Sequence, residues 1–270
     1  MAPLSPAEID SFFTRGFVLL PQQFTAEEVA RLAQICDRMR TVADVVAQDS
    51  PLHPESYASA HPGIAWHGSQ FVLGRVQAGP HAGQTRIDRI VWAGAAEPEL
   101  LEWGADPRLL QPVATLLGTK GMQHLINQIH YKLPGDGVEF PWHQDSSHRR
   151  YGTPEWRDAN GRGSYVQTIV AIDPCGLDNG PLLFVENSCQ HGHIPPDAHG
   201  DLPQELLDPQ HIVPVQMEPG DVVLFGPYTI HGSSPNHSSR SRRLFINGYA
   251  HPEANTRIYP GQGAGRMLSV

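Results

Sequence analysis

Three side chains of types that bind transition metals occur at spacings that could bring them together. His143 and Asp145 flank Gln144, and on a strand an imidazole and a carboxylate two residues apart point to the same face. Two ligands bind weakly, so a third is needed. His231 is the candidate, because the turn and buried apolar run at residues 219–225 could carry it to the mouth of a barrel. Two histidines and one carboxylate leave open coordination positions, which suits non-haem Fe(II) and O2.

A structural role is the alternative for each of these residues. The chain has 15 histidines, so a His-x-Asp spacing arises easily by chance, and it recurs at His199 and Asp201. That second pair lies among prolines and glycines with no strand pattern, so we do not expect it to bind metal. A single histidine after a strand, such as His231, is often a hydrogen-bonded core residue.

The composition indicates one large domain that needs no disulfide bonds. The chain has 270 residues, 40% of them hydrophobic, and its 26 glycines and 25 prolines favour many short strands over a helical bundle. A net charge of −9 without a basic stripe argues against nucleic acid, and gives no general support for a polyanionic substrate. No apolar run reaches the ~20 residues of a membrane span, so we expect no membrane partner. Three cysteines without Cys-x-x-Cys spacing and no signal peptide favour a cytoplasmic location.

The elements that must position these residues are helices at the front and strands behind. Capping boxes at Ser5 and Thr25 predict helices over 5–15 and from 25 to beyond 42, and Asp106-Pro107 opens a third helix that ends at Gly118. Strand patterns cover residues 17–20, 71–76, 87–92, 123–133, 164–172, 181–185, 211–217, 221–225 and 242–249. The pattern predicts a mainly β sandwich or barrel with flanking α-helices on its outer face.

The stretch that follows His231 connects these observations to a known family. A serine follows at position 233, an Asn-x-Ser turn at 236–238, and an arginine at 242 starts the next strand. This order resembles the phytanoyl-CoA dioxygenase family of Fe(II)/2-oxoglutarate oxygenases. Further motifs agree: Lys-x-Pro-Gly at 132–135, Asp-Asn-Gly-Pro-Leu at 178–182, Pro-Gly-Asp at 219–221 and Gly-Phe-Val-Leu-Leu at 16–20. The resemblance spans about residues 5–250.

The resemblance implies a double-stranded β-helix, a jelly-roll and cupin-like core, in a single dioxygenase domain over 1–270. We expect an N-terminal helical part at about 1–118, the metal-binding core at about 119–250, and a C-terminal tail at 251–270, whose glycines at 261–265 follow no strand. The resemblance also implies that His143, Asp145 and His231 bind Fe(II), with 2-oxoglutarate as co-substrate and O2 as oxidant.

Arg242 is expected to bind the distal carboxylate of 2-oxoglutarate through two parallel hydrogen bonds, with a hydroxyl from Ser233. Arg240 and Arg243 are the alternatives for this role. On a strand Arg240 would share the face of Arg242, whereas Arg243 would point the opposite way.

The resemblance also implies contacts to 2-oxoglutarate from two strands that precede His231 in the sequence. Gln128 and His130 should share the inward face of one strand, although His130 could equally be a core histidine. Thr168 on the next strand is a further candidate, and Phe140 could form a wall of the pocket.

The implied reaction hydroxylates an unactivated C–H bond and releases succinate and CO2. The carboxylate ligand disfavours halogenation, while desaturation, epoxidation and ring formation stay open. A cupin-like metal enzyme that does not use 2-oxoglutarate would leave Arg242 and Ser233 without a role, and a complete triad argues against an inactive binding protein.

We expect a small-molecule substrate, such as an amino-acid derivative or a natural-product intermediate, and the sequence leaves the oligomeric state open. Segments 48–92 and 146–163 should line its pocket. The second is either a lid that carries Tyr151 and Trp156 over the substrate or a solvated loop.

Overall fold

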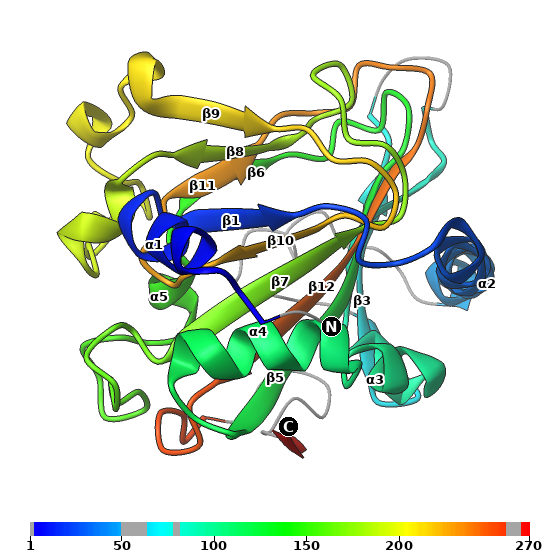
Figure 1. Cartoon of the computed structure of the whole chain (residues 1–270). Coiled ribbons are helices and arrows are strands. Elements are labelled where there is room, and N and C mark those ends of the chain that lie inside the picture. Colours follow the sequence, from blue (N-terminus) through cyan, green and yellow to red (C-terminus); the bar gives the residue numbers. More distant parts are fainter. Residues whose placement is uncertain (1–2, 50–63, 78–81, 258–265) are drawn as a thin grey trace.

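The computed structural model describes residues 3–49, 64–77, 82–257 and 266–270, and within them the chain forms two antiparallel sheets (Figure 1). The larger has nine strands in the order β1-β10-β7-β12-β5-β4-β3-β2, with β13 paired to β5; the smaller has the order β6-β11-β8-β9. The strands of the larger sheet are β1 Phe17–Leu20, β2 Ile64–Trp66, β3 Ser69–Arg75, β4 Thr85–Val91, β5 Gly121–Lys132, β7 Tyr165–Ala171, β10 Val222–Phe225, β12 Arg242–Ala250 and β13 Arg266–Ser269. Those of the smaller are β6 Phe140–His143, β8 Leu182–Val185, β9 Ile212–Val215 and β11 His231–Ser233.

Helices cover the face of the larger sheet that points away from the smaller one (Figure 1). They are α1 Pro6–Thr14, α2 Ala26–Asp49, α3 Glu99–Trp103 and α4 Pro107–Leu117, with a single turn α5 Asp145–His148 beside β6. Short 3-10 turns lie at Ala93–Ala95, Ser188–His191, Gln204–Leu206 and Pro209–His211. None of the helices in the described part of the chain is long and apolar enough to cross a membrane. The prediction of a mainly β fold with outer helices is confirmed.

The expected caps set the helix ends. Ser5 and Glu8 form the capping box of α1, Asp106 caps α4, and Gly118 ends α4 with a φ of +70°, a conformation that glycine adopts without strain.

Two apolar clusters lie on opposite faces of the larger sheet. Successive side chains of β12 point alternately into one cluster and the other. Phe245 packs with the helices on the outer face, whereas Leu244 and Ile246 pack between the sheets. The same alternation sends Arg243 outward to Asp173, at 2.8 Å, and turns Arg242 inward.

Three short elements depart from the sequence-based expectations. β2 and β11 were not predicted as strands, because with three residues each they are too short to show a periodic pattern. β13 lies in the expected C-terminal tail, where it adds to the edge of β5; the glycine run at 261–265 lies outside the described residues.

The buried ring of His124, on the outer side of β5, should make the stability of the fold depend on pH. Its ring is fully buried, its Nε2 lies 3.0 Å from Asn247 Oδ1, and burial lowers its pKa to about 4. An unfolded chain, with a histidine pKa near 6.5, binds this proton more readily, so stability should fall as the pH drops from about 6.5 to about 4. We expect this residue alone to cost about 2–3 kcal/mol of unfolding free energy between pH 7 and pH 4.5.

Urea denaturation of the wild type and of His124→Gln at both pH values measures this contribution. The variant should lose less stability on acidification than the wild type does. Equal losses in the two proteins would show that the buried ring is not the source.

Candidate metal centre and co-substrate cavity

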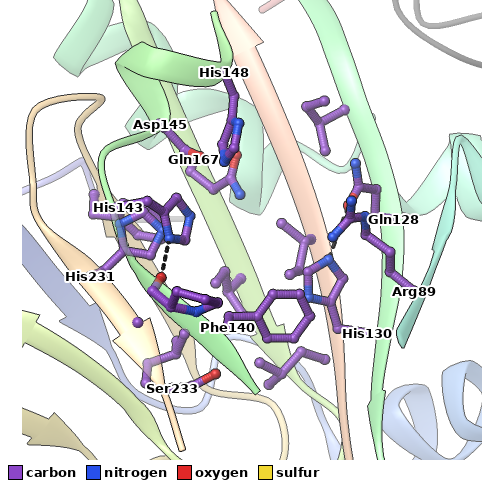
Figure 2. A pocket seen from close by; sticks show the side chains of 18 of the residues that line it. Arg89, Gln128, His130, Phe140, His143, Asp145, His148, Gln167, His231 and Ser233 are labelled. Carbon is purple, nitrogen blue, oxygen red and sulfur yellow. Dashed lines mark hydrogen bonds between the residues drawn. The ribbon is translucent and has the colours of Figure 1, made fainter. Parts of the chain in front are cut away.

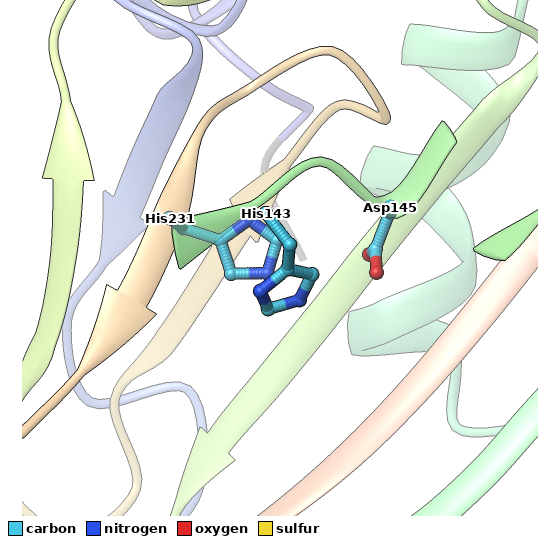
Figure 3. Close-up of side chains that lie close together, drawn as sticks. All are labelled: His143, Asp145 and His231. Carbon is cyan, nitrogen blue, oxygen red and sulfur yellow. The ribbon is translucent and has the colours of Figure 1, made fainter. Parts of the chain in front are cut away.

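The three predicted metal ligands converge at one end of the smaller sheet (Figure 3). His143 ends β6, His231 begins β11, and the two residues stand directly opposite each other in the β6–β11 pairing. Asp145 starts α5, and one ligand atom from each of the three side chains lies within 4.8 Å of the others. The sequence-based route to this cluster was partly wrong. Asp145 lies beyond the strand that ends at His143, and His231 belongs to its own strand rather than to the end of β10.

The hydrogen bonds of His143 and His231 determine which nitrogen of each ring can bind a cation. His143 Nδ1 lies 2.7 Å from the Pro141 carbonyl and His231 Nδ1 lies 2.9 Å from the Thr229 carbonyl. A carbonyl only accepts hydrogen bonds, so each Nδ1 carries a proton, and Nε2 is the ring nitrogen that can bind a metal. Burial lowers the pKa of His231 to about 4, which keeps its ring neutral.

Asp145 supplies the negative charge of the group. Burial alone would raise its pKa, but the neighbouring His231 and Arg149 lower it, so the carboxylate is ionised. Its Oδ2 is buried without a hydrogen-bond partner. An ionised, buried oxygen with no donor is costly unless a cation binds it. Two imidazole nitrogens and this carboxylate therefore fit a divalent transition metal.

Gln144, between the two ligands, anchors this turn through all four of its amide hydrogen bonds. Nε2 donates to the carbonyls of Gly192 and Tyr228, and Oε1 accepts from the Ile194 amide at 2.8 Å and the Ser146 hydroxyl at 3.3 Å. The side chain is fully buried. It therefore ties the turn that carries Asp145 to the segment that leads into β11 and His231.

A cavity of about 400 Å³ between the two sheets opens onto the triad (Figure 2). Strands β4, β5, β7 and β12 of the larger sheet line one wall, and β6 and β11 line the other. The predicted residues Gln128, His130, Phe140, Ser233 and Arg242 all line it.

Arg242 and Ser233 form the inner end of the cavity, and a cation that the sequence analysis missed stands behind them. Arg242 is buried, and its Nε and Nη2 donate to the Gly180 carbonyl. Lys132 Nζ donates to Ser233 Oγ at 2.7 Å and to the Ser234 carbonyl. Burial and the charge of Arg242 lower the pKa of Lys132 to about 6. Lys132 could have been predicted from its position in the sequence, because the alternation along β5 places it on the same face as Gln128 and His130.

Gly180 makes this packing possible. Its φ is +74°, and an added Cβ would lie 2.3 Å from the Ser234 carbonyl oxygen, so no other residue fits without displacing the backbone.

His130 lies in the wall between the triad and the inner end. Its ring stacks on Phe140 at 4.8 Å, and its Nε2 lies 3.0 Å from Gln128 Oε1 (Figure 2). Burial, helped by Arg89 and Arg242, holds its pKa well below the ordinary value. His130 therefore presents a neutral ring to the cavity.

Thr168 is not part of the cavity, which corrects the prediction by one residue. Its neighbours Gln167 and Ile169 line the cavity instead, while the buried Thr168 hydroxyl faces the outer side and donates to the Asn247 carbonyl at 3.4 Å. Because all seven residues of β7 are buried, no polar alternation marked its inward face.

The expected lid residues are also placed differently. Tyr151 and Trp156 stack on each other at 5.0 Å within the core and are not among the residues that line the cavity. From their segment, His148 and Arg149 line the cavity instead.

Other segments contribute to the cavity as well. Arg89 and Val91 do so from segment 48–92, whose residues 50–63 lie outside the described residues, and Arg257 does so from the expected tail. Of the second His-x-Asp pair, only the intervening Gly200 lines the cavity.

Comparisons with known proteins agree with this geometry. The family model described as Phytanoyl-CoA dioxygenase (PhyH) matches residues 12–244. A methylphosphonate hydroxylase from Gimesia maris is 30% identical over 131 residues, which is 48% of this chain and 46% of that protein. The chain thus spans less than half of that relative. An ectoine dioxygenase from Sphingopyxis alaskensis is 24% identical over 253 residues, which is 87% of this chain and 72% of that protein.

A solved structure confirms the predicted double-stranded β-helix fold. The crystal structure of EctD from S. alaskensis with 2-oxoglutarate and 5-hydroxyectoine matches with a TM-score of 0.67 at 23% identity. The match covers 100% of this chain and 86% of that chain.

Removing any one ligand should abolish metal binding. We expect His143→Ala, Asp145→Ala and His231→Ala each to lose more than about 100-fold in Fe(II) affinity and to stay folded. His199→Ala, from the second His-x-Asp pair, is the matched control and should bind as the wild type does. Anaerobic titration with Fe(II), with circular dichroism as the folding check, makes the measurement. Wild-type affinity in any triad variant would remove that residue from the site.

Gln144 should act on the metal without touching it. Gln144→Ala leaves two carbonyls and one amide without their partner, and we expect Fe(II) affinity to fall about 10- to 100-fold through the loosened turn. Gln210→Ala, at an exposed glutamine, is the control. An unchanged Fe(II) affinity in Gln144→Ala would show that the pairing of β6 with β11 alone positions the ligands.

Proposed function

This chain belongs to the phytanoyl-CoA dioxygenase family, and on that premise we propose that it is an Fe(II)/2-oxoglutarate-dependent oxygenase that hydroxylates a C–H bond of a small metabolite. The reaction consumes O2 and converts 2-oxoglutarate to succinate and CO2. The observation that carries this proposal is the presence of a metal-binding triad and a buried cationic end in one cavity.

His143, Asp145 and His231 would hold the iron. When bound, Fe(II) supplies the activation of O2 for attack on an unreactive C–H bond. Three protein ligands leave room for a chelating co-substrate and for O2, which a four-ligand structural site would not. The Pro141 and Thr229 carbonyls orient the two rings, so that both imidazoles present Nε2 to the ion.

Arg242, Ser233 and Lys132 would hold the distal carboxylate of 2-oxoglutarate. Arg242 and Lys132 stand opposite each other in the pairing of β12 with β5, and a charge is costly at such buried positions. Burial and the charge of Arg242 lower the pKa of Lys132 to about 6. A carboxylate bound between them offsets this cost, and the hydroxyl of Ser233, 2.7 Å from Lys132 Nζ, adds a further donor or acceptor. These residues have no evident role in a cupin-like enzyme without 2-oxoglutarate.

The cavity limits the size of the substrate. Its volume of about 400 Å³ must hold both 2-oxoglutarate and the substrate, so a small molecule fits and a large one does not. The relatives named for methylphosphonate and ectoine support a small polar substrate.

Arg242 and Arg243 offer a matched pair for a test of co-substrate binding. Arg242→Ala should weaken 2-oxoglutarate binding at least about 30-fold, since a buried carboxylate loses its charged partner at ~2–5 kcal/mol. Arg242→Lys should recover only part, because an ammonium cannot form the two parallel bonds. Arg243→Ala should leave this affinity unchanged, because its guanidinium binds Asp173 on the outer face.

The measurement is an anaerobic titration of the Fe(II) protein with 2-oxoglutarate, followed by its absorbance. Substrate-stimulated succinate release from a panel of small metabolites then tests turnover. An Fe(II) protein that does not bind 2-oxoglutarate would overturn the proposal in favour of the cupin-like alternative.

A further inference from the structure

We infer that Lys132 is a neutral amine in the free protein and takes up a proton from the solvent when 2-oxoglutarate binds. The co-substrate and a proton would then bind together, and the occupancy of the site would depend on pH. This inference rests on the proposed oxygenase function and concerns the regulation of the same site. The observation behind it is that Lys132 is buried beside a second cation, with no carboxylate of the described residues in ion-pair contact with either.

The choice of a lysine at this position is unusual for this chain. The sequence has 19 lysines and arginines, and only Lys120 and Lys132 are lysines. Lys120 is exposed, whereas Lys132 is fully buried. Arginine keeps its proton at any ordinary pH, whereas the pKa of lysine shifts readily on burial. A lysine can therefore be neutral at this buried position, where an arginine would keep its charge.

The side chains of Lys132 and Arg242 lie against the same residue. The two stand opposite each other in the pairing of β5 with β12, and both are fully buried. Arg242 Nε and Nη2 donate to the Gly180 carbonyl. Lys132 Nζ lies 3.1 Å from the point that a Cβ on Gly180 would occupy. The register and the contact with Gly180 thus bring two cationic groups into one buried place.

The contacts of Lys132 Nζ are all with neutral groups. Nζ donates to Ser233 Oγ at 2.7 Å and to the Ser234 carbonyl. The centroid of the Phe140 ring is 5.6 Å away, and a single ring compensates a buried charge only weakly. A neutral amine still has two hydrogens, which are enough for both hydrogen bonds. Loss of the proton therefore breaks neither contact.

The two acids in the turn after β5 do not pair with Lys132. Asp136 is held by the backbone of its own turn, because its carboxylate accepts from the amides of Leu133 at 2.7 Å and Val138 at 3.0 Å. Glu139 is exposed. Their charges favour the ammonium form of Lys132 from a distance, but less than burial disfavours it.

The other titratable groups packed around Lys132 supply no unpaired negative charge. Burial raises the pKa of the Cys175 thiol to about 11 and holds that of His130 well below its ordinary value, so both are neutral. The remaining groups are paired or exposed: Asp178 with Arg240, Asp173 with Arg243, and the exposed His237 beyond Ser234.

A buried pair of cations without an anion is relieved when the lysine loses its proton. Burial, followed by the charge of Arg242, lowers the pKa of Lys132 to about 6, so the amine is mainly neutral at pH 7.5. A carboxylate between the two side chains would raise that pKa toward the ordinary value of about 10.4. Binding above pH 6 therefore takes up about one proton, and the affinity for 2-oxoglutarate should fall about tenfold for each pH unit above about 6.5.

Calorimetry on the anaerobic Fe(II) protein counts the proton. 2-Oxoglutarate is titrated at pH 7.5 in HEPES and in Tris, whose ionisation enthalpies differ, and the difference in heat gives the number of protons taken up. We expect about one proton for the wild type and none for Lys132→Met, whose weaker binding should also be independent of pH. Lys120→Met, at the exposed lysine, is the matched control and should behave as the wild type does. No uptake by the wild type, or equal uptake by Lys132→Met, would overturn the inference.

Nuclear magnetic resonance tests the same point on the wild type, without a variant that must fold. Lysine labelled with 13C at Cε gives one signal for each of the two lysines, and Zn(II) replaces Fe(II) to avoid paramagnetic broadening. Without 2-oxoglutarate the Lys132 signal should titrate near pH 6, while the Lys120 signal serves as the internal reference for an exposed lysine. With saturating 2-oxoglutarate, Lys132 should stay charged at pH 8. A Lys132 that is charged at pH 8 without 2-oxoglutarate, or neutral with it, would contradict the inference.

The binding of 2-oxoglutarate separates the two hypotheses. A wild-type protein that binds none contradicts the proposed function itself. One that binds 2-oxoglutarate without taking up a proton contradicts only the role of Lys132 as the proton acceptor.

Discussion

The buried amide of Gln144 is the interaction on which the metal centre depends. The two histidines are neighbours through the regular pairing of β6 with β11, but Asp145 lies beyond the end of its strand, where no ladder fixes it. The side-chain amide of Gln144 fixes this turn in place of strand pairing. Its four hydrogen bonds connect the turn after His143 to two loops, including the one that leads into β11. A buried amide with every bond satisfied has one orientation, and the carboxylate therefore has one position relative to both rings.

The inner end of the cavity depends on a different constraint, the pairing of β12 with β5. In this register Arg242 stands opposite Lys132, and like charges in opposite positions destabilise a sheet. The protein accepts this cost at a fully buried position and relieves it partly through the lowered pKa of Lys132. The same register carries Gln128 and His130 into the wall of the cavity that Arg242 also lines.

The sequence predicted best the elements that are long and that differ in polarity between their two faces. The strands β5 and β12 have 12 and nine residues, and their alternation grouped the side chains by face. The family resemblance chose the inward face, and Gln128, His130 and Arg242 do line the cavity. On β7 both faces are buried, so alternation gave no sign of which face is inward, and Thr168 was chosen in place of Gln167. The aromatic rings of Tyr151 and Trp156 pack on each other in the core between the sheets. Arg257 was missed because its segment depends on contacts with a loop about 100 residues earlier.

The sign of the net charge is a poor guide to what this cavity accepts. The chain carries a net charge of −9, which on its own disfavours an anionic ligand. That average belongs to the exposed surface, where salt screens a charge within about 8 Å at physiological ionic strength. Among the described residues, the lining of the cavity includes four arginines and a single carboxylate. In a partly buried site the nearest charges dominate, since screening there is weak. Composition cannot show where these arginines lie within the fold, so the net charge of the chain does not describe the lining of the cavity.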